Sequence, residues 1–522
     1  MARLTSQFKP IHLLIGLVVF ALAAFLINEG REPTQHLRVL AGSELEDVLP
    51  LLDEIERETG IRLEFDFTGT LDGAESLAAG AKYDLAWFSH AKYLNLLQEK
   101  TGQRYIKSSE RIMTSPVVLG IKRSLGERLG WCSGAVSWRD IAAQAATGGL
   151  RFAMTNPATS NSGFSTVVAA QVAFSGEALS VEQVDVAEMR QLAKGHQLRS
   201  GSSGWLVDLY LRQQDQTDGL FNYESVLLSL NQNPQLKEQL CLIYPSEGVI
   251  TADYPLLLLD EAERVSYQKL VDFLKSTSIQ QRLMASGRRP VNAQVALAAT
   301  FPNQLILEAP FPATLEVVDA ILMAYLDRQL RPGFSLYVID TSGSMEGEGM
   351  QQLKTTLHGL SGKDQSLTGQ FARYRQGERI GFLPFASQPK SLSSWDFSLN
   401  TETLSQLASA IDALQPKGGT AIFDALVRAY ELAAVERQKQ GADYPISLVL
   451  MSDGANTSGR DEEAFRRWYQ QHGPKNIPVF SVTFGQADQG QMQRIAELTG
   501  GRNFDGRKHS LSHVFKTIRG YQ

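Results

Sequence analysis

The chain has 522 residues, of which 43% are hydrophobic and 20% charged, a balance typical of folded protein and not of a disordered chain. Its length exceeds what one hydrophobic core usually serves, so we expect about two to four domains. The formal net charge of −6 gives no support for nucleic-acid binding, and two cysteines without a C-x-x-C spacing predict neither a zinc site nor a cysteine-rich scaffold.

The first clear pattern is the apolar run at residues 11–27, which contains no Asp, Glu, Lys or Arg. A run of this length is at the short limit of a membrane-spanning helix and longer than most signal-peptide cores. We therefore predict an uncleaved transmembrane signal anchor within residues 1–34. The alternatives are a cleaved signal peptide, for which Ala21, Ala23 and Ala24 supply small residues, and a buried core helix.

Residues 35–305 alternate between strand and helix patterns. A strand pattern at residues 37–43 precedes a helical pattern at residues 46–60, which Gly60 closes as a C-cap, and a second strand pattern follows at residues 61–67. Alternation of this kind predicts a mostly parallel sheet covered by helices.

Three groups of residues in this region carry a family resemblance: Ala79-Gly80-Ala81 with Asp84, Asn156-Pro157-Ala158 with Ser160 to Gly163, and Tyr244-Pro245 with Glu247-Gly248. With them the region resembles type II periplasmic solute-binding proteins, particularly the branch that includes oxyanion binders. The resemblance implies two α/β lobes that close on a solute, held by hydroxyls and backbone N–H groups at strand ends and helix N-termini.

The residues that could contact a solute in such a fold are Ser43, Thr68, Ser89, Ser160 and Ser162. Each of them alone is also what a helix cap or a turn requires, so the hypothesis depends on the whole set. No Arg or Lys lies within these turns to balance a strongly anionic ligand such as an oxyanion.

Apolar residues recur at helical spacing from Phe311 until Pro332-Gly333 stops the pattern. We interpret residues 306–332 as a connecting helix docked on a neighbouring domain. The alternative is a docking helix for another membrane component, but amphipathic helices usually face a core.

The best-defined site pattern begins at the apolar run Leu336 to Asp340, which predicts a buried parallel strand. Asp340, Ser342 and Ser344 then follow at alternate positions of a turn. This oxygen-rich cluster suits a hard cation such as Mg²⁺ or Mn²⁺, with Ca²⁺ as a further option. Three ligands are too few for an octahedral shell, so other loops must supply the rest.

Two later turns supply them. Thr420 follows a glycine turn that opens a helical pattern, and Asp453 follows the apolar strand pattern Ile446 to Met451. Because strand ends and the turns after them share the carboxyl edge of an open α/β sheet, the three loops can meet at one crevice.

In this order the three loops closely resemble the metal-ion-dependent adhesion site of von Willebrand factor A domains. The resemblance covers residues 333–522 and implies a doubly wound, Rossmann-like α/β sheet. It also implies that one coordination position is left for an acidic group of a partner protein. The residues implied to hold the metal, directly or through water, are Asp340, Ser342, Ser344, Thr420 and Asp453.

Common hydrolase, zinc-protease and nucleotide-binding motifs are missing from the sequence. We therefore expect a non-catalytic protein, anchored in the cytoplasmic membrane and exposed on its outer, periplasmic side, that joins a solute-binding-like module to a metal-dependent protein-binding module. The main alternative is the receptor of a solute or oxyanion importer, and a metal-dependent hydrolase is the minor one.

The location outside the cytoplasm has a consequence for Cys132 and Cys241. Disulfides persist in that compartment, so we expect the two to pair, the alternative being two buried free thiols. In von Willebrand domains that couple metal binding to a change of shape, the last helix moves, and here that helix is predicted at Ser510 to Arg519. Two modules that merely share a membrane anchor are the simpler expectation.

Overall fold

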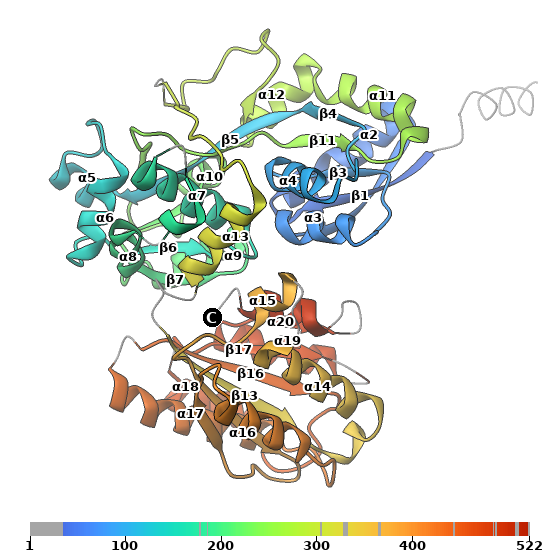
Figure 1. The fold of residues 1–522 in the computed structure, drawn as a ribbon, viewed down its shortest axis with the longest axis vertical. Helices are drawn as coiled ribbons and strands as arrows, with labels where there is room; N and C mark the ends of the chain where they lie inside the picture. The colour runs from blue at the N-terminus through green and yellow to red at the C-terminus, as the bar shows by residue number, and fades with distance from the viewer. Residues whose placement is uncertain are drawn as a thin grey trace, which may run out of the picture.

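The computed structural model describes residues 35–519 apart from residues 177–178, 185, 303–304, 327–331, 364–366, 442–443, 475, 484, 486–487 and 507–510. Figure 1 shows two lobes side by side and a third domain below them. The anchor predicted at residues 11–27 lies outside the described residues. Within the described part of the chain, no helix is long and apolar enough to cross a membrane.

The first lobe is an α/β unit on a five-stranded sheet in the order β2-β1-β3-β11-β4. Strands β1, β2 and β3 are parallel, and β11, which follows β10 of the second lobe, is antiparallel to β3 and β4. The strands are β1 (Gln35–Gly42), β2 (Ile61–Thr68), β3 (Leu85–Trp87), β4 (Ser108–Arg111) and β11 (Pro255–Leu258), and the α-helices are α2 (Leu52–Thr59), α3 (Thr70–Ala78), α4 (Lys92–Thr101), α11 (Arg264–Leu274) and α12 (Thr277–Ala285).

The second lobe is built around the long strand β5, which pairs with β8, β9, β10 and β12. Its most buried helix is α7, which is buried on nearly all sides and therefore runs through the core. The strands are β5 (Met113–Lys122), β6 (Phe152–Thr155), β7 (His196–Ser200), β8 (Gly219–Tyr223), β9 (Leu240–Ile243), β10 (Thr251–Ala252) and β12 (Arg289–Pro290), and the α-helices are α5 (Arg123–Leu129), α6 (Trp138–Ala146), α7 (Asn161–Ser175), α8 (Ala187–Lys194), α9 (Ser203–Gln213) and α10 (Glu224–Leu230).

One predicted helix of the first lobe is partly wrong. Residues 46–60 do not form a single α-helix: a 3-10 helix, η1 (Ser43–Leu51), comes first, and α2 begins only at Leu52. Pro50 lies inside η1, where its missing N–H interrupts α-helical hydrogen bonding. The end of the segment is as predicted, because Gly60 closes α2 with a positive φ of 67°.

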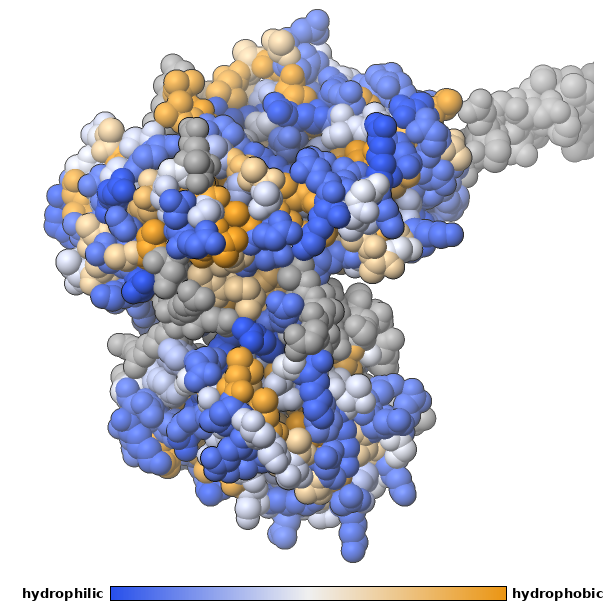
Figure 2. All heavy atoms as spheres, viewed as in Figure 1, coloured by the Kyte–Doolittle hydropathy of each residue, from blue (hydrophilic) through white to orange (hydrophobic). Residues whose placement is uncertain are grey.

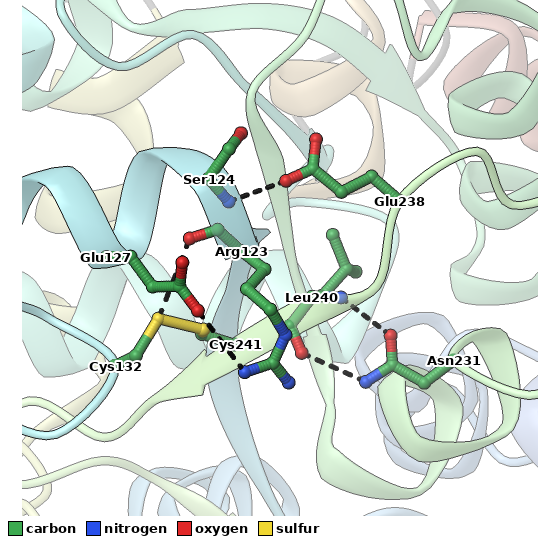
Figure 3. Close-up of a disulfide and its surroundings, with 8 residues drawn as sticks. All are labelled: Arg123, Ser124, Glu127, Cys132, Asn231, Glu238, Leu240 and Cys241. Carbon is green, nitrogen blue, oxygen red and sulfur yellow. Dashed lines mark hydrogen bonds and ion pairs between the residues drawn. A yellow bond between two sulfur atoms is a disulfide. The ribbon is translucent and has the colours of Figure 1, made fainter.

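The two cysteines form a disulfide in the second lobe (Figure 3). Cys132 follows α5 and Cys241 lies on β9, so the bond ties a helical segment to the edge of the sheet. A hydrogen bond from the Ser124 N–H to a Glu238 carboxylate oxygen joins the same two segments. The bond is the pairing expected of a chain that folds outside the cytoplasm.

The connecting segment contains the helix α13 (Leu315–Ala324), which starts later than predicted and is capped by the Thr314 hydroxyl, which accepts a hydrogen bond from the Val317 N–H. Its apolar face is buried through Val318, Ile321 and Leu322, and it packs against α7 of the second lobe and α4 of the first. Hydrophobic residues show on the surface near α13 in Figure 2.

The third domain has a six-stranded sheet in the order β15-β14-β13-β16-β17-β18, parallel except for β15. One hydrophobic cluster covers each face, which confirms the doubly wound fold. The strands are β13 (Phe334–Asp340), β14 (Arg379–Phe385), β15 (Ser393–Asp396), β16 (Ile446–Ser452), β17 (Val479–Thr483) and β18 (Asn503–Asp505), and the α-helices are α14 (Glu348–His358), α15 (Leu367–Ala372), α16 (Thr401–Asp412), α17 (Ile422–Gln440), α18 (Glu462–His472), α19 (Gln489–Thr499) and α20 (Leu511–Arg519).

Local sequence explains these elements. Every residue of β13 and β16 is buried, as expected for central parallel strands covered on both faces. Asn400, Asp461 and Asp488 begin α16, α18 and α19 as N-caps, each accepting a hydrogen bond from the N–H three residues later. The five parallel strands have their carboxyl ends at one edge of the sheet.

Candidate functional site

Three loops meet at the carboxyl edge of the third domain's sheet. Asp340 is the last residue of β13, Asp453 follows β16, and Thr420 lies just before α17. Since β13 and β16 are adjacent and parallel, their ends bring the two aspartates to the same edge. Gly418, with a φ of +94°, makes the turn that carries Thr420 toward them.

Backbone hydrogen bonds fix the three loops to one another. The Gly343 N–H donates to the Gly418 oxygen (2.9 Å), which joins the first loop to the second. The Thr457 N–H donates to the Thr420 oxygen (2.8 Å), and the Thr420 N–H donates to the Thr457 hydroxyl (2.9 Å), which joins the second loop to the third. The site is therefore a preformed cradle.

Asp340 is fully buried at the base of this cradle. Its Oδ1 accepts a hydrogen bond from the Ser342 N–H (2.7 Å), and its Oδ2 accepts one from the Ser452 hydroxyl (2.5 Å). Ser452 was not predicted as a site residue, although it precedes Asp453 in the Ser-Asp-Gly turn. As the buried last residue of β16, it holds the Asp340 carboxylate in place.

The hydroxyls complete the cluster. Ser342 Oγ lies 3.0 Å from Ser344 Oγ, which donates a hydrogen bond to Asp453 Oδ1 (2.8 Å). A Cβ placed on Gly454 would lie 3.3 Å from Ser344 Oγ and 3.8 Å from Thr420 Oγ1, so the Thr420 hydroxyl closes the other side. The structure thus brings together all five residues predicted to hold a metal.

The electrostatics of the cluster suit a cation. Burial raises the pKa of Asp340, and the nearby charge of Asp453 raises it further; burial also raises the pKa of Asp453. Among the described residues neither carboxylate forms an ion pair with Lys or Arg. The described part of the chain holds no group of three or more His, Cys, Asp or Glu that could bind a metal, so a metal here would depend on the hydroxyls and water as well.

These pKa shifts predict opposite effects of Asp340→Asn with and without metal. A carboxyl whose folded pKa is raised stabilises the fold at low pH and loses that contribution as the pH rises through the folded pKa. In EDTA at neutral pH the variant should therefore be more stable than the wild type. The gain is about 1.4 kcal/mol for each pH unit by which the pKa of Asp340 in the folded protein exceeds that in the unfolded chain. The difference should vanish below about pH 4, the usual range of Asp.

Urea denaturation across pH measures this effect. With saturating Mg²⁺ the order should reverse, because the variant lacks a carboxylate for the ion. A variant that is less stable than the wild type in EDTA at neutral pH would contradict the assignment of Asp340 as an unpaired buried charge.

The residues predicted to contact a solute stand at strand ends of the first lobe and at the start of α7 in the second. Ser43 and Ser89 follow β1 and β3, Thr68 ends β2, and Ser160 and Ser162 stand at the start of α7. Ser89 Oγ is 2.8 Å from Thr70 Oγ1, and Ser162 Oγ bonds to Thr155 (2.9 Å) and Ser203 (2.8 Å) within its own lobe. Their role toward a solute stays a prediction.

Two acceptors next to these residues in the chain were missed by the sequence reasoning. Asn161, 2% exposed, donates from Nδ2 to the Tyr223 hydroxyl (3.1 Å), but its Oδ1 is buried without a donor among the described residues. Oε1 of Glu44 also lacks a donor among the described residues, although the Glu44 carboxyl receives hydrogen bonds from Ser89 and the backbone. Burial raises the pKa of Glu44. Because buried acceptors normally have donors, these atoms mark where a donor group of a ligand or water would bind.

The family models identify both parts of the chain. Residues 37–289 match the model of bacterial extracellular solute-binding protein, and residues 336–516 match the model of the von Willebrand factor type A domain. The chain therefore joins a solute-binding domain to a von Willebrand A domain. The two lobes are the former, and the third domain is the latter.

Relatives in sequence match a limited part of the protein. The inter-alpha-trypsin inhibitor heavy chain H2 of Sus scrofa is 31% identical over 161 residues, and that of Mus musculus is 32% identical over 161 residues. Each match covers 29% of this chain and 15% of the relative, so the chain spans only a small part of these proteins.

Similar solved structures match the solute-binding domain. The sulfate-binding protein SubI from Mycobacterium tuberculosis H37Rv is 17% identical, with 54% of this chain and 96% of that chain covered and a TM-score of 0.39. Iron-bound HitA from Pseudomonas aeruginosa is 14% identical, with 55% and 97% covered and a TM-score of 0.43. Likeness at this level does not identify a ligand.

The solute-binding domain contacts the von Willebrand A domain away from the metal residues. Trp205 of α9 lies with its ring 6.4 Å from that of Phe480 near the start of β17, and Asn156 Nδ2 donates to the backbone oxygen of Arg519 at the end of α20 (3.4 Å). Arg519 in turn reaches Ser335 at the start of β13. These contacts lie at the amino edge of the sheet, whereas Asp340 lies at its carboxyl edge, where Ser344 is exposed.

Proposed function

We propose that this protein is a non-catalytic binding protein, anchored in the cytoplasmic membrane with its domains outside, whose von Willebrand A domain binds an acidic group of a partner protein through a divalent metal. The observation that carries the proposal is the pair of buried carboxylates, Asp340 and Asp453, which have no cationic partner among the residues that the structure describes. They lie at an edge of the sheet where Ser344 is exposed to solvent. A site of this composition favours a hard cation.

The residues that would hold Mg²⁺ or Mn²⁺ are Asp340, Ser342, Ser344, Thr420 and Asp453. When bound, the ion would supply a positive charge and a coordination position for one further anionic oxygen. The chain's own contribution is to keep these side chains in place before any metal arrives: Ser452 orients the Asp340 carboxylate, and the bonds between Gly343 and Gly418 and between Thr420 and Thr457 hold the loops together.

Two features support the location outside the cytoplasm. The disulfide between Cys132 and Cys241 is of a kind that persists in oxidising compartments. The apolar run at residues 11–27 precedes the folded domains directly and has the composition of a membrane anchor. Together they favour an attached protein with both domains on the periplasmic side.

The second candidate function is that of a solute receptor. It is favoured by Glu44 Oε1 and Asn161 Oδ1, buried acceptors that have no donor in the described part of the chain. They would suit a solute that offers hydrogen-bond donors better than an oxyanion. Binding of a radiolabelled oxyanion such as sulfate to the full chain would contradict this expectation and would favour the receptor of an oxyanion importer instead.

A metal-dependent pull-down tests the leading proposal. The full chain, immobilised in Mg²⁺, should retain a specific protein from solubilised membranes and release it in EDTA. The Asp340→Ala variant should retain no partner protein, because it lacks one of the two buried carboxylates that would hold the metal. The control Asp396→Ala changes a carboxylate whose side chain is 76% exposed on β15 and should behave as the wild type. Equal retention by Asp340→Ala would contradict the proposal.

A further inference from the structure

Lys516 on α20 is a buried cation at the boundary between the two domains. Its side chain is 0% exposed and forms ion pairs with Asp72 and with Glu75 (3.2 Å), both on α3 of the first lobe. The ring of Phe371 lies on its other side, 5.4 Å from Nζ. Burial alone would lower the pKa of Lys516, but the charges of Asp72 and Glu75 raise it, so the ammonium stays charged.

The carboxylates that hold this ammonium lie where the two lobes touch. Gly69, which precedes α3, approaches the loop before α7 so closely that a Cβ there would clash with the backbone oxygen of Thr159, and the same Cβ would lie 3.6 Å from Asp72 Oδ2. Asn156 on that loop binds the backbone oxygen of Arg519. Lys516 and Arg519, one helical turn apart on α20, therefore contact the first and the second lobe respectively.

The helix that makes these contacts is an integral part of the von Willebrand A domain. Arg519 forms two hydrogen bonds with the Glu378 carboxylate (2.5 and 2.7 Å), and the Phe515 ring stacks on that of Tyr337 with centroids 6.2 Å apart. Figure 1 shows α15 and α20 on the side of this domain that faces the lobes. A displacement of α20 would therefore change both domains.

The connecting segment bridges the lobes a second time. Glu308 pairs with Lys92 of the first lobe (2.8 Å), and the Phe311 ring lies 6.1 Å from that of His90 in the first lobe and 6.0 Å from that of Phe164 in the second. One continuous hydrophobic cluster includes residues of α4, α7 and α13. Separation of the lobes would have to break this cluster as well.

We propose that Asp72 and Glu75 form an ammonium-binding site that the chain fills with its own Lys516, so that docking of the von Willebrand A domain holds the two lobes closed. A receptor that captures a free solute must open and close. Here an internal cation occupies the acidic site at the lobe junction, and the solute-binding domain is a closed platform for as long as α20 is docked. The inference does not depend on the metal site.

Charge reversal at Lys516 tests this inference in the full chain. Lys516→Glu places a third carboxylate beside Asp72 and Glu75 and should release α20 from α3. In hydrogen-exchange mass spectrometry, amide exchange in α3 and α20 should then become faster by about tenfold or more. The swap variant Lys516→Glu with Asp72→Lys and Glu75→Lys should restore slow exchange in both helices.

A lobe-to-lobe distance gives the second readout. Spin labels at Glu58→Cys in the first lobe, 53% exposed, and Asp215→Cys in the second, 76% exposed, should report one narrow distance in the wild type and an additional longer one in Lys516→Glu. The control Arg467→Glu reverses a charge that is 63% exposed on α18 and should change neither readout.

The inference is overturned if folded Lys516→Glu keeps the wild-type distance distribution, even where amide exchange in α3 and α20 becomes faster. If charge reversal prevents folding, Lys516→Met, which removes only the charge, takes its place. A longer lobe-to-lobe distance in that variant supports the inference, and the wild-type distance contradicts it.

Discussion

Saturating Mg²⁺ is expected to raise the melting temperature of the von Willebrand A transition, and Asp340→Ala is expected to abolish that rise. An ion that binds only the folded state at a hundred times its Kd stabilises that state by about 2.7 kcal/mol. For a domain of this size that free energy corresponds to roughly 5–10 °C. Differential scanning calorimetry in Mg²⁺ and in EDTA measures the shift.

The control for this experiment is again Asp396→Ala, which removes a carboxylate of the same domain at an exposed position and should keep the full shift. Ser452→Ala should keep only part of it, because the variant retains all five predicted ligands but loses the hydroxyl that orients Asp340. If Asp340→Ala melts with the full metal-dependent shift, the assignment of the site is wrong.

Glu378→Ala is expected to destabilise the von Willebrand A domain by about 3–5 kcal/mol, since it leaves the buried Arg519 guanidinium without its carboxylate. Glu378 is 4% exposed, and it also accepts hydrogen bonds from the Ser335 hydroxyl (2.6 Å) and the Arg375 N–H (2.9 Å). Urea denaturation of the full chain, monitored through the fluorescence transition of this domain, measures the loss of unfolding free energy.

The matched control removes an exposed ion pair of the same domain. The side chains of Arg428 and Glu431 on α17 are 51% and 52% exposed, and Glu431→Ala should cost no more than about 0.5 kcal/mol. A loss below about 1 kcal/mol in Glu378→Ala would mean that the carboxylate does not anchor α20 to the sheet.

The metal residues could be predicted from the sequence because their geometry is largely local. Asp340, Ser342 and Ser344 are close together in one turn, and the position of Thr420 and Asp453 follows from the rule that parallel strands end at one edge. Ser452 could have been included, since it lies in the same turn as Asp453. Whether its hydroxyl can bond to Asp340 depends on which face of β16 it occupies at the end of the strand. A strand that is buried on both faces does not reveal this from its sequence.

The contacts between the domains could not be predicted in this way. Lys516 and Glu75 are 441 residues apart, and a Lys in an amphipathic helix usually indicates a solvated face. Lys516 is buried only because α20 docks on α3, and the residue pattern of neither helix predicts that docking. Glu44 illustrates the same limit: a glutamate after a strand suggests a surface turn, yet here its Oε1 is buried at the lobe junction.

Electron paramagnetic resonance of Mn²⁺ tests the central claim most directly, because free Mn²⁺ gives a sharp spectrum that is lost on binding. The full chain should bind one Mn²⁺ tightly, and Asp340→Ala and Asp453→Ala should lose that site while Asp396→Ala keeps it. An acidic peptide should then perturb the bound Mn²⁺, whereas its amidated counterpart should not. Tight Mn²⁺ binding that survives both Asp340→Ala and Asp453→Ala, or its absence from the wild type, would contradict the account.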